Sequence, residues 1–185
     1  MNHKSTPERH ENKRFEDGPY HDHIKLLHSG EAYFDRLKKV IENAQKEIHL
    51  QTYIFENDET GNSVVQDLIQ HGILIRFFSP LFSLNNFYLG RRMHHKIVVA
   101  DGKTALIGGI NIADKYHGTP ELEPWLDYAV QLDCPAAGDL QKLCSDYFFK
   151  KGSSKKIKPV FHSAGSGTLI GIIQNDWLKR KTEVC

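Results

Sequence analysis

Residues 91–111, RRMHHKIVVADGKTALIGGIN, place several titratable side chains at the start of an apolar run. His94 and Lys96 stand two residues apart, so in an extended segment both side chains point to one side, about 7 Å from each other, with His95 on the opposite side. This spacing can hold an anionic group between an imidazole and an ammonium. A histidine can act as a nucleophile toward phosphorus, and a neighbouring lysine can neutralise charge on the non-bridging oxygens.

A hydrogen-bond donor follows at the end of the next expected strand. Asn111 comes three residues after Gly108, and its amide could donate to the same oxygens. Gly109, between them, lets the backbone approach closely. The alternative is an edge strand whose charges block aggregation, which would explain the His-x-Lys pair alone. It does not explain the spacing of the Asp and the Gly-Gly-x-Asn that follow, so we favour a site.

The stretch HHKIVVADGKTALIGGIN resembles the signature of the phospholipase D superfamily, H-x-K-x4-D-x6-G-[GS]-x-N. The matching residues are His94, Lys96, Asp101, Gly108, Gly109 and Asn111. Within the superfamily, the chain most resembles the N-terminal catalytic half of bacterial cardiolipin synthases and their soluble relatives, over residues 24–150. NAQKEIHLQTYIFENDETG is similar to the opening helix and strand of that half, and PWLDYAVQLDCPAA is similar to the segment after the motif.

The resemblance implies a phosphatidyltransferase or phosphodiesterase that acts on a phosphatidylglycerol-like phospholipid through a phosphohistidine, with no cofactor and no metal. His94 would attack phosphorus, Lys96 and Asn111 would hold the phosphoryl oxygens, and a second histidine would protonate the leaving alcohol. The family also places a carboxylate on the strand after the motif, where it fixes the tautomer of the nucleophile. Asp127, two residues after Trp125, is the candidate.

Asp101 belongs to the signature, but it stands in a tight turn five residues beyond Lys96. At about 3.3 Å for each strand residue, that position is too far from His94 for direct chemistry. We therefore interpret Asp101 as structural. The residues expected to contact the substrate are Arg91, Arg92, Gly108, Gly109 and Trp125.

Two departures from the family pattern bear on activity. The family uses two such motifs, from two halves of one chain or from two subunits, and these 185 residues contain one. A homodimer or another chain is therefore expected to supply the second motif. Between Gln70 and His71 the family also carries a further strand and helix, so we expect one sheet strand to be absent and the chain to be a truncated or internally deleted copy.

The hydrophobic periodicity predicts an α/β fold, in which helices flank a mixed β-sheet. Helices are expected over 31–46, from a capping box at Ser63 and Gln66, and from Pro135. Strands are expected over 47–55, 73–78, 94–100, 104–109 and 127–133. The buried stripe of the last helix is expected to contain Leu140, Leu143, Cys144, Tyr147 and Phe148. Residues 1–23 read as a polar arm, and 151–185 as a basic, Gly- and Ser-rich segment.

Composition limits the possible ligands and the cellular location of the protein. A formal net charge of +1 argues against a nucleic-acid substrate, because phosphate contacts along DNA need a basic stripe, although a nuclease-like homodimer stays an alternative. A non-catalytic remnant that binds phospholipid or a partner chain is the other alternative. The three cysteines lack CxxC spacing, the first 23 residues do not form a signal peptide, and no apolar run is long enough to span a membrane. These features favour a cytoplasmic location or a peripheral one at the cytoplasmic membrane face.

Residues 79–90, SPLFSLNNFYLG, carry aromatic and aliphatic side chains just before Arg91 and Arg92. The loop could touch acyl chains while the arginines meet lipid phosphates. Alternatively, its aromatic residues pack under the sheet. The sequence leaves both interpretations open.

Overall fold

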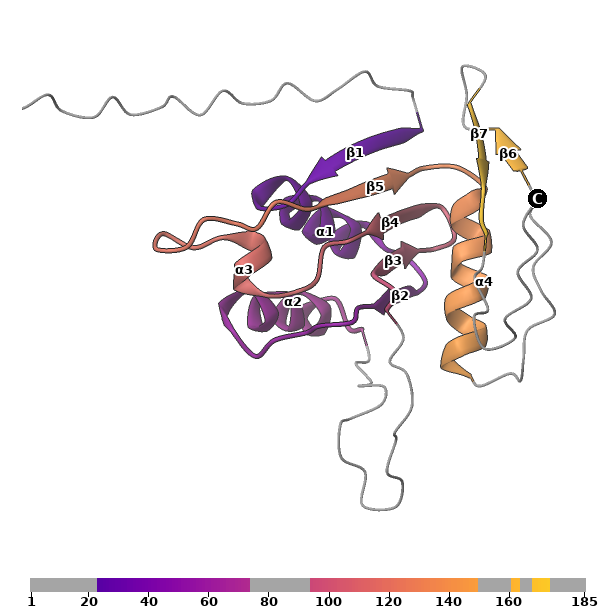
Figure 1. Ribbon diagram of the computed structural model, residues 1–185. Helices are drawn as coiled ribbons and strands as arrows, with labels where there is room; N and C mark the ends of the chain where they lie inside the picture. The colour runs from indigo at the N-terminus through magenta and orange to yellow at the C-terminus, as the bar shows by residue number, and fades with distance from the viewer. Residues whose placement is uncertain (1–22, 74–93, 150–160, 164–167, 174–185) are drawn as a thin grey trace, which may run out of the picture.

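The computed structural model describes residues 23–73, 94–149, 161–163 and 168–173 (Figure 1). Its elements in chain order are β1 (Ile24–His28), α1 (Glu31–Asn43), β2 (Ile48–Gln51), α2 (Glu59–Gln70), β3 (Ile97–Ala100), β4 (Thr104–Gly108), α3 (Asp114–His117), β5 (Tyr128–Leu132), α4 (Ala136–Phe148), β6 (Phe161–Ser163) and β7 (Leu169–Gly171). Apart from residues 23 and 73, the expected N-terminal arm, the strand at 73–78, the loop at 79–90 and both arginines lie outside the described residues.

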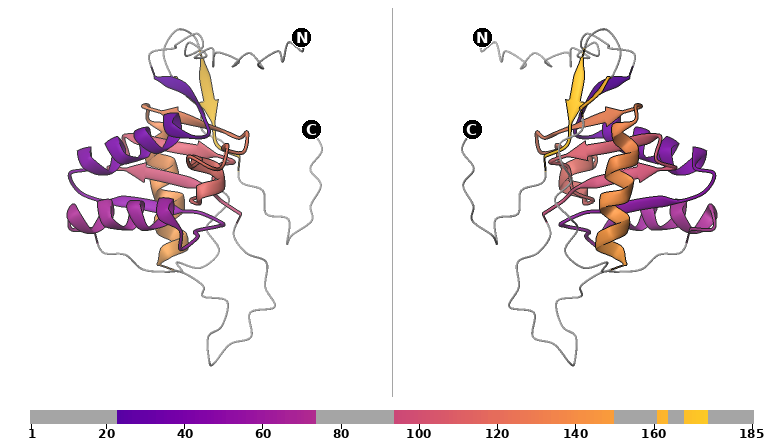
Figure 2. Two further views of the ribbon diagram at one scale, coloured as in Figure 1. Left: turned by 90° about the vertical axis from the view of Figure 1, so that its left-hand side faces the viewer. Right: turned by 90° about the vertical axis from the view of Figure 1, so that its right-hand side faces the viewer.

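One sheet of five strands, in the order β1-β5-β4-β3-β2, forms the centre of the fold. Every pairing between its strands is antiparallel, and a parallel bridge joins Phe55 to Ile112 beyond the strand ends. Helices α1 and α2 cover one face, and α4 covers the other (Figure 1, Figure 2). The predicted α/β fold, with helices on both faces of a sheet, is therefore confirmed, but the pairings among the described strands of this sheet are antiparallel rather than mixed.

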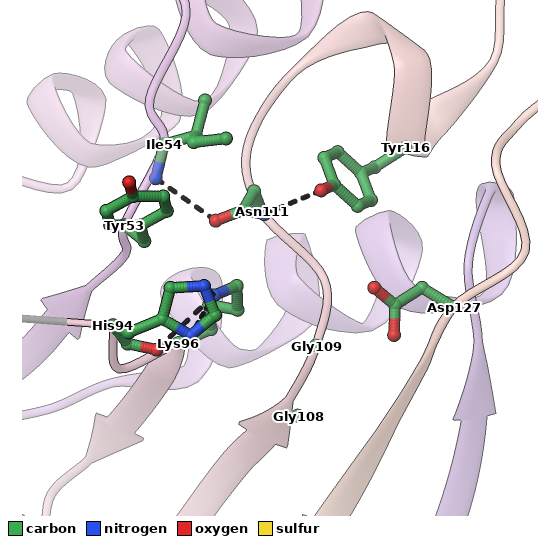
Figure 3. A pocket seen from close by; sticks show the side chains of 9 residues that line it. All are labelled: Tyr53, Ile54, His94, Lys96, Gly108, Gly109, Asn111, Tyr116 and Asp127. Atoms are coloured by element: carbon green, nitrogen blue, oxygen red, sulfur yellow. Dashed lines mark hydrogen bonds between the residues drawn. The ribbon is translucent and has the colours of Figure 1, made fainter.

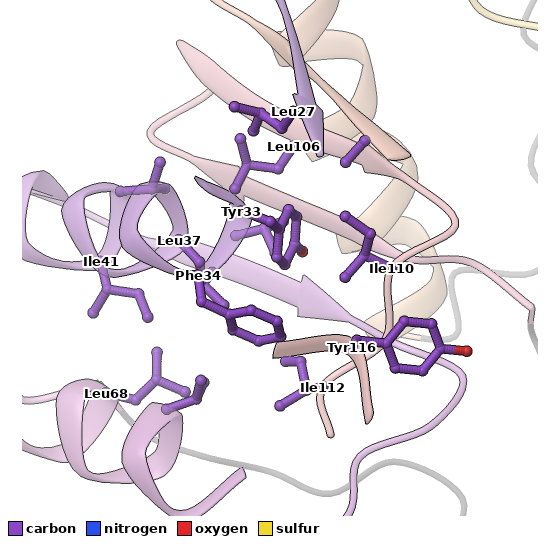
Figure 4. Packing of buried hydrophobic residues seen from close by; sticks show 14 of the residues in the cluster. Leu27, Tyr33, Phe34, Leu37, Ile41, Leu68, Leu106, Ile110, Ile112 and Tyr116 are labelled. Carbon is purple, nitrogen blue, oxygen red and sulfur yellow. The ribbon is translucent and has the colours of Figure 1, made fainter. Parts of the chain in front are cut away.

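Strand β3, which lies between β4 and the edge strand β2, is buried on both faces. Val98 and Ala100 pack in the cluster beneath α1 and α2, whereas Ile97 and Val99 pack in the cluster beneath α4. All four residues are at most 6% exposed, which explains why this strand reads as an unbroken apolar run. Figure 4 shows the first cluster, in which side chains of α1 meet the β4 residue Leu106 and the segment that follows β4.

The β3–β4 hairpin holds the site motif, and its turn has the predicted chemistry. Asp101 has a φ of 54° and Gly102 a φ of 63°. Positive φ at both central residues matches a type I′ turn, which follows the twist of the flanking strands and favours Asp-Gly. Lys103 N–H closes the turn by donating to the carbonyl of Ala100 at 3.0 Å. The hairpin prediction is confirmed.

The predicted start of α2 was wrong. The helix begins at Glu59, four residues before Ser63, because Asp58 caps it. The Asp58 carboxylate accepts the Gly61 N–H at 2.9 Å, which satisfies one of the unpaired amides of the first turn. Gln66 therefore lies inside the helix and not at its start.

Other boundaries also differ from the predictions. The first helix ends at Asn43, not residue 46, and the first predicted strand ends at Gln51. In α4, Leu140, Leu143 and Cys144 are buried as expected, but Tyr147 is 37% exposed and Phe148 is only partly buried, so the predicted stripe does not extend through the last turn of the helix. The edge strand β1 was not predicted. None of the helices in the described ranges is long and apolar enough to cross a membrane.

Candidate active site

An open cavity of about 450 Å³ lies where the end of β4 meets the start of β5 and the residues just before β3 (Figure 3). Its lining residues are Tyr53, Ile54, His94, Lys96, Gly108, Gly109, Asn111, Tyr116 and Asp127. Of the predicted site residues within the described ranges, only Asp101 and Trp125 do not line it. The structure thus gathers into one cavity residues that are up to 33 positions apart in the motif region.

His94 and Lys96 precede the first residue of β3, yet both side chains face the cavity, as Figure 3 shows. The Lys96 Nζ lies 3.2 Å from Nε2 and 3.3 Å from Nδ1 of His94, and it donates to the His94 carbonyl at 3.3 Å. Tyr53 lies beside both groups, with its ring centroid 4.6 Å from that of His94 and 5.3 Å from the Lys96 Nζ. An imidazole and an ammonium are therefore held together at the cavity.

The Lys96 side chain is placed to receive an anion. The residue is only 7% exposed, and no carboxylate among the described residues forms a salt bridge with it. Burial lowers the pKa of the Lys96 ammonium, while the negative charge of Asp127 acts in the opposite direction. An anionic ligand in the cavity would likewise favour the charged form of this lysine.

His95 points to the opposite side of the sheet, as strand alternation predicts. Its Nδ1 lies 3.4 Å from the Gln51 Oε1, and its ring meets the edge of the Tyr147 ring at a centroid distance of 5.4 Å. Burial lowers the pKa of His95, and the nearby charges of His94 and Lys96 lower it further. This histidine therefore joins β2 to α4 and does not contribute to the cavity.

Asn111 is held in one orientation by its hydrogen bonds. Its Oδ1 accepts the Ile54 N–H at 3.0 Å, and its Nδ2 donates to the Tyr116 hydroxyl at 2.8 Å. A backbone N–H can only donate, so the amide oxygen must face Ile54 and the amide nitrogen must face the cavity side. With 2% exposure, Asn111 has little freedom to turn away.

The two glycines make room for the next strand. A Cβ on Gly108 would lie 2.3 Å from the carbonyl oxygen of Tyr128, and a Cβ on Gly109 would lie 2.1 Å from Oδ1 of Asp127. The Gly109 N–H also donates to the Tyr128 carbonyl at 2.9 Å. The absence of side chains here brings the Asp127 carboxylate into the wall of the cavity.

Asp127 accepts the N–H of Tyr128 at 2.7 Å through Oδ1. Within the described part of the chain, no hydrogen bond joins Asp127 to His94, so the predicted control of the His94 tautomer by Asp127 stays a prediction. Figure 3 shows the carboxylate directed into the cavity on the side opposite His94.

Asp101 and Trp125 support the site from outside the cavity. The Asp101 carboxylate accepts the N–H groups of Gln45, Lys46 and Glu47 at 2.8, 2.9 and 3.0 Å, which supports its interpretation as structural. Trp125 is 56% exposed, and its ring packs against that of Tyr116 at a centroid distance of 5.8 Å.

Three lining residues, Tyr53, Ile54 and Tyr116, were missed by the sequence predictions. Tyr53 follows the end of β2, and Tyr116 lies in the short helix α3, where an aromatic residue suggests only core packing. Across the described residues, no three His, Cys, Asp or Glu side chains come close enough together to hold a metal ion.

No protein-family model matches the chain. It is similar to cardiolipin synthase 1 of Bacillus cereus, with 30% identity over 165 residues that cover 71% of this chain and 32% of that protein. It is also similar to cardiolipin synthase A of Pseudomonas putida, with 32% identity over 151 residues that cover 64% of this chain and 32% of that protein. The chain thus spans about a third of the length of these curated relatives.

Among solved structures, the phosphatidylserine synthase of Haemophilus influenzae has a similar fold. The TM-score is 0.54 at 16% identity, and the match covers 70% of this chain and 37% of that one. At 16% identity, this similarity shows a shared fold and not a shared activity.

Proposed function

Because the chain belongs to the phospholipase D superfamily and is cardiolipin synthase-like over part of its length, we propose that it is a phosphatidyltransferase or phosphodiesterase that acts on phospholipid through a phosphohistidine. The observation that carries this proposal is the cavity in which the His94 ring lies 3.2 Å from the buried Lys96 ammonium, beside the Asn111 amide. We propose a phosphatidylglycerol-like substrate and peripheral contact with the cytoplasmic membrane face.

The proposed reaction has two displacements at phosphorus. In the first, a ring nitrogen of His94 forms a bond to phosphorus, the bond from phosphorus to the leaving alcohol breaks, and the leaving oxygen takes a proton from a second histidine. In the second, the acceptor alcohol gives its proton to that histidine and attacks phosphorus, and the P–N bond breaks. Lys96 neutralises the charge that develops on the non-bridging oxygens, and the Asn111 amide donates a hydrogen bond to them.

The second histidine must lie opposite His94, because attacking and leaving atoms are in line at phosphorus. Among the described residues, no other histidine lines the cavity. His95 faces α4, and the His117 ring is engaged with Thr60 at 3.1 Å and packs on Phe34. We therefore propose that a second copy of the chain, related by a two-fold axis, brings another His-x-Lys pair to the cavity mouth.

The test is to trap the covalent intermediate with phosphatidylglycerol labelled at phosphorus. After a rapid quench, protein-bound label that is lost in acid and kept in base is expected on the wild type and absent from His94→Gln. His71→Gln is the matched control, since this exposed histidine bonds the Asp67 carbonyl at the end of α2. Equal labelling of His94→Gln would contradict the proposal, as would the absence of label from a wild type that sedimentation shows to be dimeric.

Lys96→Met should reduce the rate of label transfer by orders of magnitude, because the charge on the phosphoryl oxygens then loses the buried Lys96 ammonium that we propose to lie beside it. Lys38→Met, which removes an exposed lysine of α1, is the matched control for loss of one positive charge. Similar rates for the two variants would mean that Lys96 does not act on the phosphoryl group.

A further inference from the structure

The Tyr116 hydroxyl occupies a part of the cavity to which neither the sequence nor the proposed reaction gives a role. Tyr116 is 8% exposed, and its backbone N–H and carbonyl are held by Ala113 and Gly30 at 2.9 and 2.8 Å. Its ring packs on Trp125, and the hydroxyl reaches the cavity beside Asn111 (Figure 3). The side chain is therefore fixed in place before any ligand binds.

Hydrogen-bond accounting defines what this hydroxyl can do. The Ile54 N–H forces the Asn111 oxygen to be the acceptor on its side, so the Asn111 Nδ2 is the donor in its 2.8 Å contact with Tyr116. The hydroxyl oxygen thus accepts, and its own proton is left to donate elsewhere. Among the described residues, the hydroxyl makes no hydrogen bond besides the one that it accepts from Asn111, and Tyr116 lines the cavity.

We infer that Tyr116 is a substrate-binding residue, whose hydroxyl donates a hydrogen bond to a non-bridging oxygen of the phosphoryl group. This inference rests on the proposed function for the identity of the ligand. The Asn111 amide and the Tyr116 hydroxyl are adjacent, so together they offer two donors to one oxygen, while Lys96 supplies the positive charge. Paired donors of this kind stabilise an oxygen on which charge develops.

Binding of inorganic phosphate to the purified chain tests the inference without any turnover. Tyr116→Phe keeps the ring that packs on Trp125 and removes only the hydroxyl. We expect it to weaken phosphate binding roughly tenfold or more, as for the loss of one hydrogen bond to a charged group. The matched control is Tyr128→Phe, which removes the hydroxyl of a 46% exposed tyrosine outside the cavity lining and should leave binding unchanged.

A merely structural Tyr116 would act only by orienting Asn111. In that case, Tyr116→Phe would have no effect in an Asn111→Ala background, where the amide is already gone. The inference predicts a further loss of phosphate binding in that background. A measurement that leaves the fold intact is the fluorine resonance of 3-fluorotyrosine placed at position 116, which is expected to move when phosphate is added.

Unchanged phosphate affinity in Tyr116→Phe, or an unmoved fluorine resonance at saturating phosphate, would overturn the inference. So would a wild type that binds no phosphate. The proposed function is judged separately: label trapped equally on wild type and Tyr116→Phe would remove the role of Tyr116 and keep the phosphohistidine. Phosphate binding that depends on Tyr116, without any trapped label, would keep the role of Tyr116 and remove the phosphohistidine.

Discussion

Replacing Asp101 by Asn separates the structural part of the signature motif from its chemical part. The carboxylate accepts three backbone N–H groups, from Gln45, Lys46 and Glu47, and so attaches the β3–β4 turn to the chain that enters β2. Asn fits this position sterically, because it tolerates the positive φ of 54° at least as well as Asp does. The substitution therefore removes charge and one acceptor without new backbone strain.

The size of the effect follows from the bonds that are lost. Oδ1 accepts two of the N–H groups and Oδ2 the third, so an Asn side chain keeps two bonds, now to a neutral oxygen, and loses the bond from Gln45. Bonds to a charged acceptor contribute about 1.5–3 kcal/mol each, and access of solvent to the turn reduces this contribution. We expect a loss of about 2 kcal/mol in the free energy of unfolding, or roughly 1 M in the urea midpoint.

The assay is urea unfolding of wild type and Asp101→Asn across a pH series, with Asp35→Asn, an exposed residue of α1, as the control. Burial acts to raise the pKa of Asp101, but the three N–H bonds outweigh it and hold that pKa below its ordinary value. The stabilisation is therefore complete above the unfolded pKa of about 4 and disappears as the pH falls through the lower folded pKa. A difference that is absent at pH 7, or that persists unchanged in acid, would refute this reasoning.

Further predictions concern the cavity wall, the partner and the core. Gly108→Ala should destabilise the fold more than Gly109→Ala in urea unfolding, because its Cβ would meet the Tyr128 carbonyl at 2.3 Å, whereas that of Gly109 meets the Asp127 side chain. Asp127→Asn should keep its thermal midpoint and lower phosphoryl transfer by orders of magnitude, and activity within about twofold of wild type would point to another carboxylate. Turnover should rise with the square of protein concentration where a dimer forms; first-order dependence in a chain shown to be monomeric by sedimentation would contradict a shared site. Burial raises the pKa of Cys144 to about 12, so this thiol should resist iodoacetamide at pH 8 until urea unfolds the protein, and rapid native labelling would argue against its burial.

Local sequence signals predicted the elements whose conformation is decided locally. The Asp101-Gly102 turn is an example, since positive φ at two successive residues favours this pair whatever lies around it. The start of α2 was not decided locally. Asp58 and Ser63 can both cap a helix, and Asp58 is used because its second carboxylate oxygen accepts the N–H of Asp114 at 2.7 Å. That contact joins residues 56 positions apart, so no local pattern could show it.

The role of Gly109 also depends on a contact with a residue that is distant in the sequence. From the sequence, this glycine was expected to let the backbone approach a bound phosphoryl group. In the structure, the space where its Cβ would lie is taken by the Asp127 carboxylate, only 2.1 Å away. Gly109 of the motif and the Asp127 carboxylate are thus two parts of one packing requirement. It follows that a substitution at Gly109 should impair the site by displacing Asp127, and that replacing Asp127 by a smaller residue should relieve the strain without restoring the chemistry that we assign to the carboxylate.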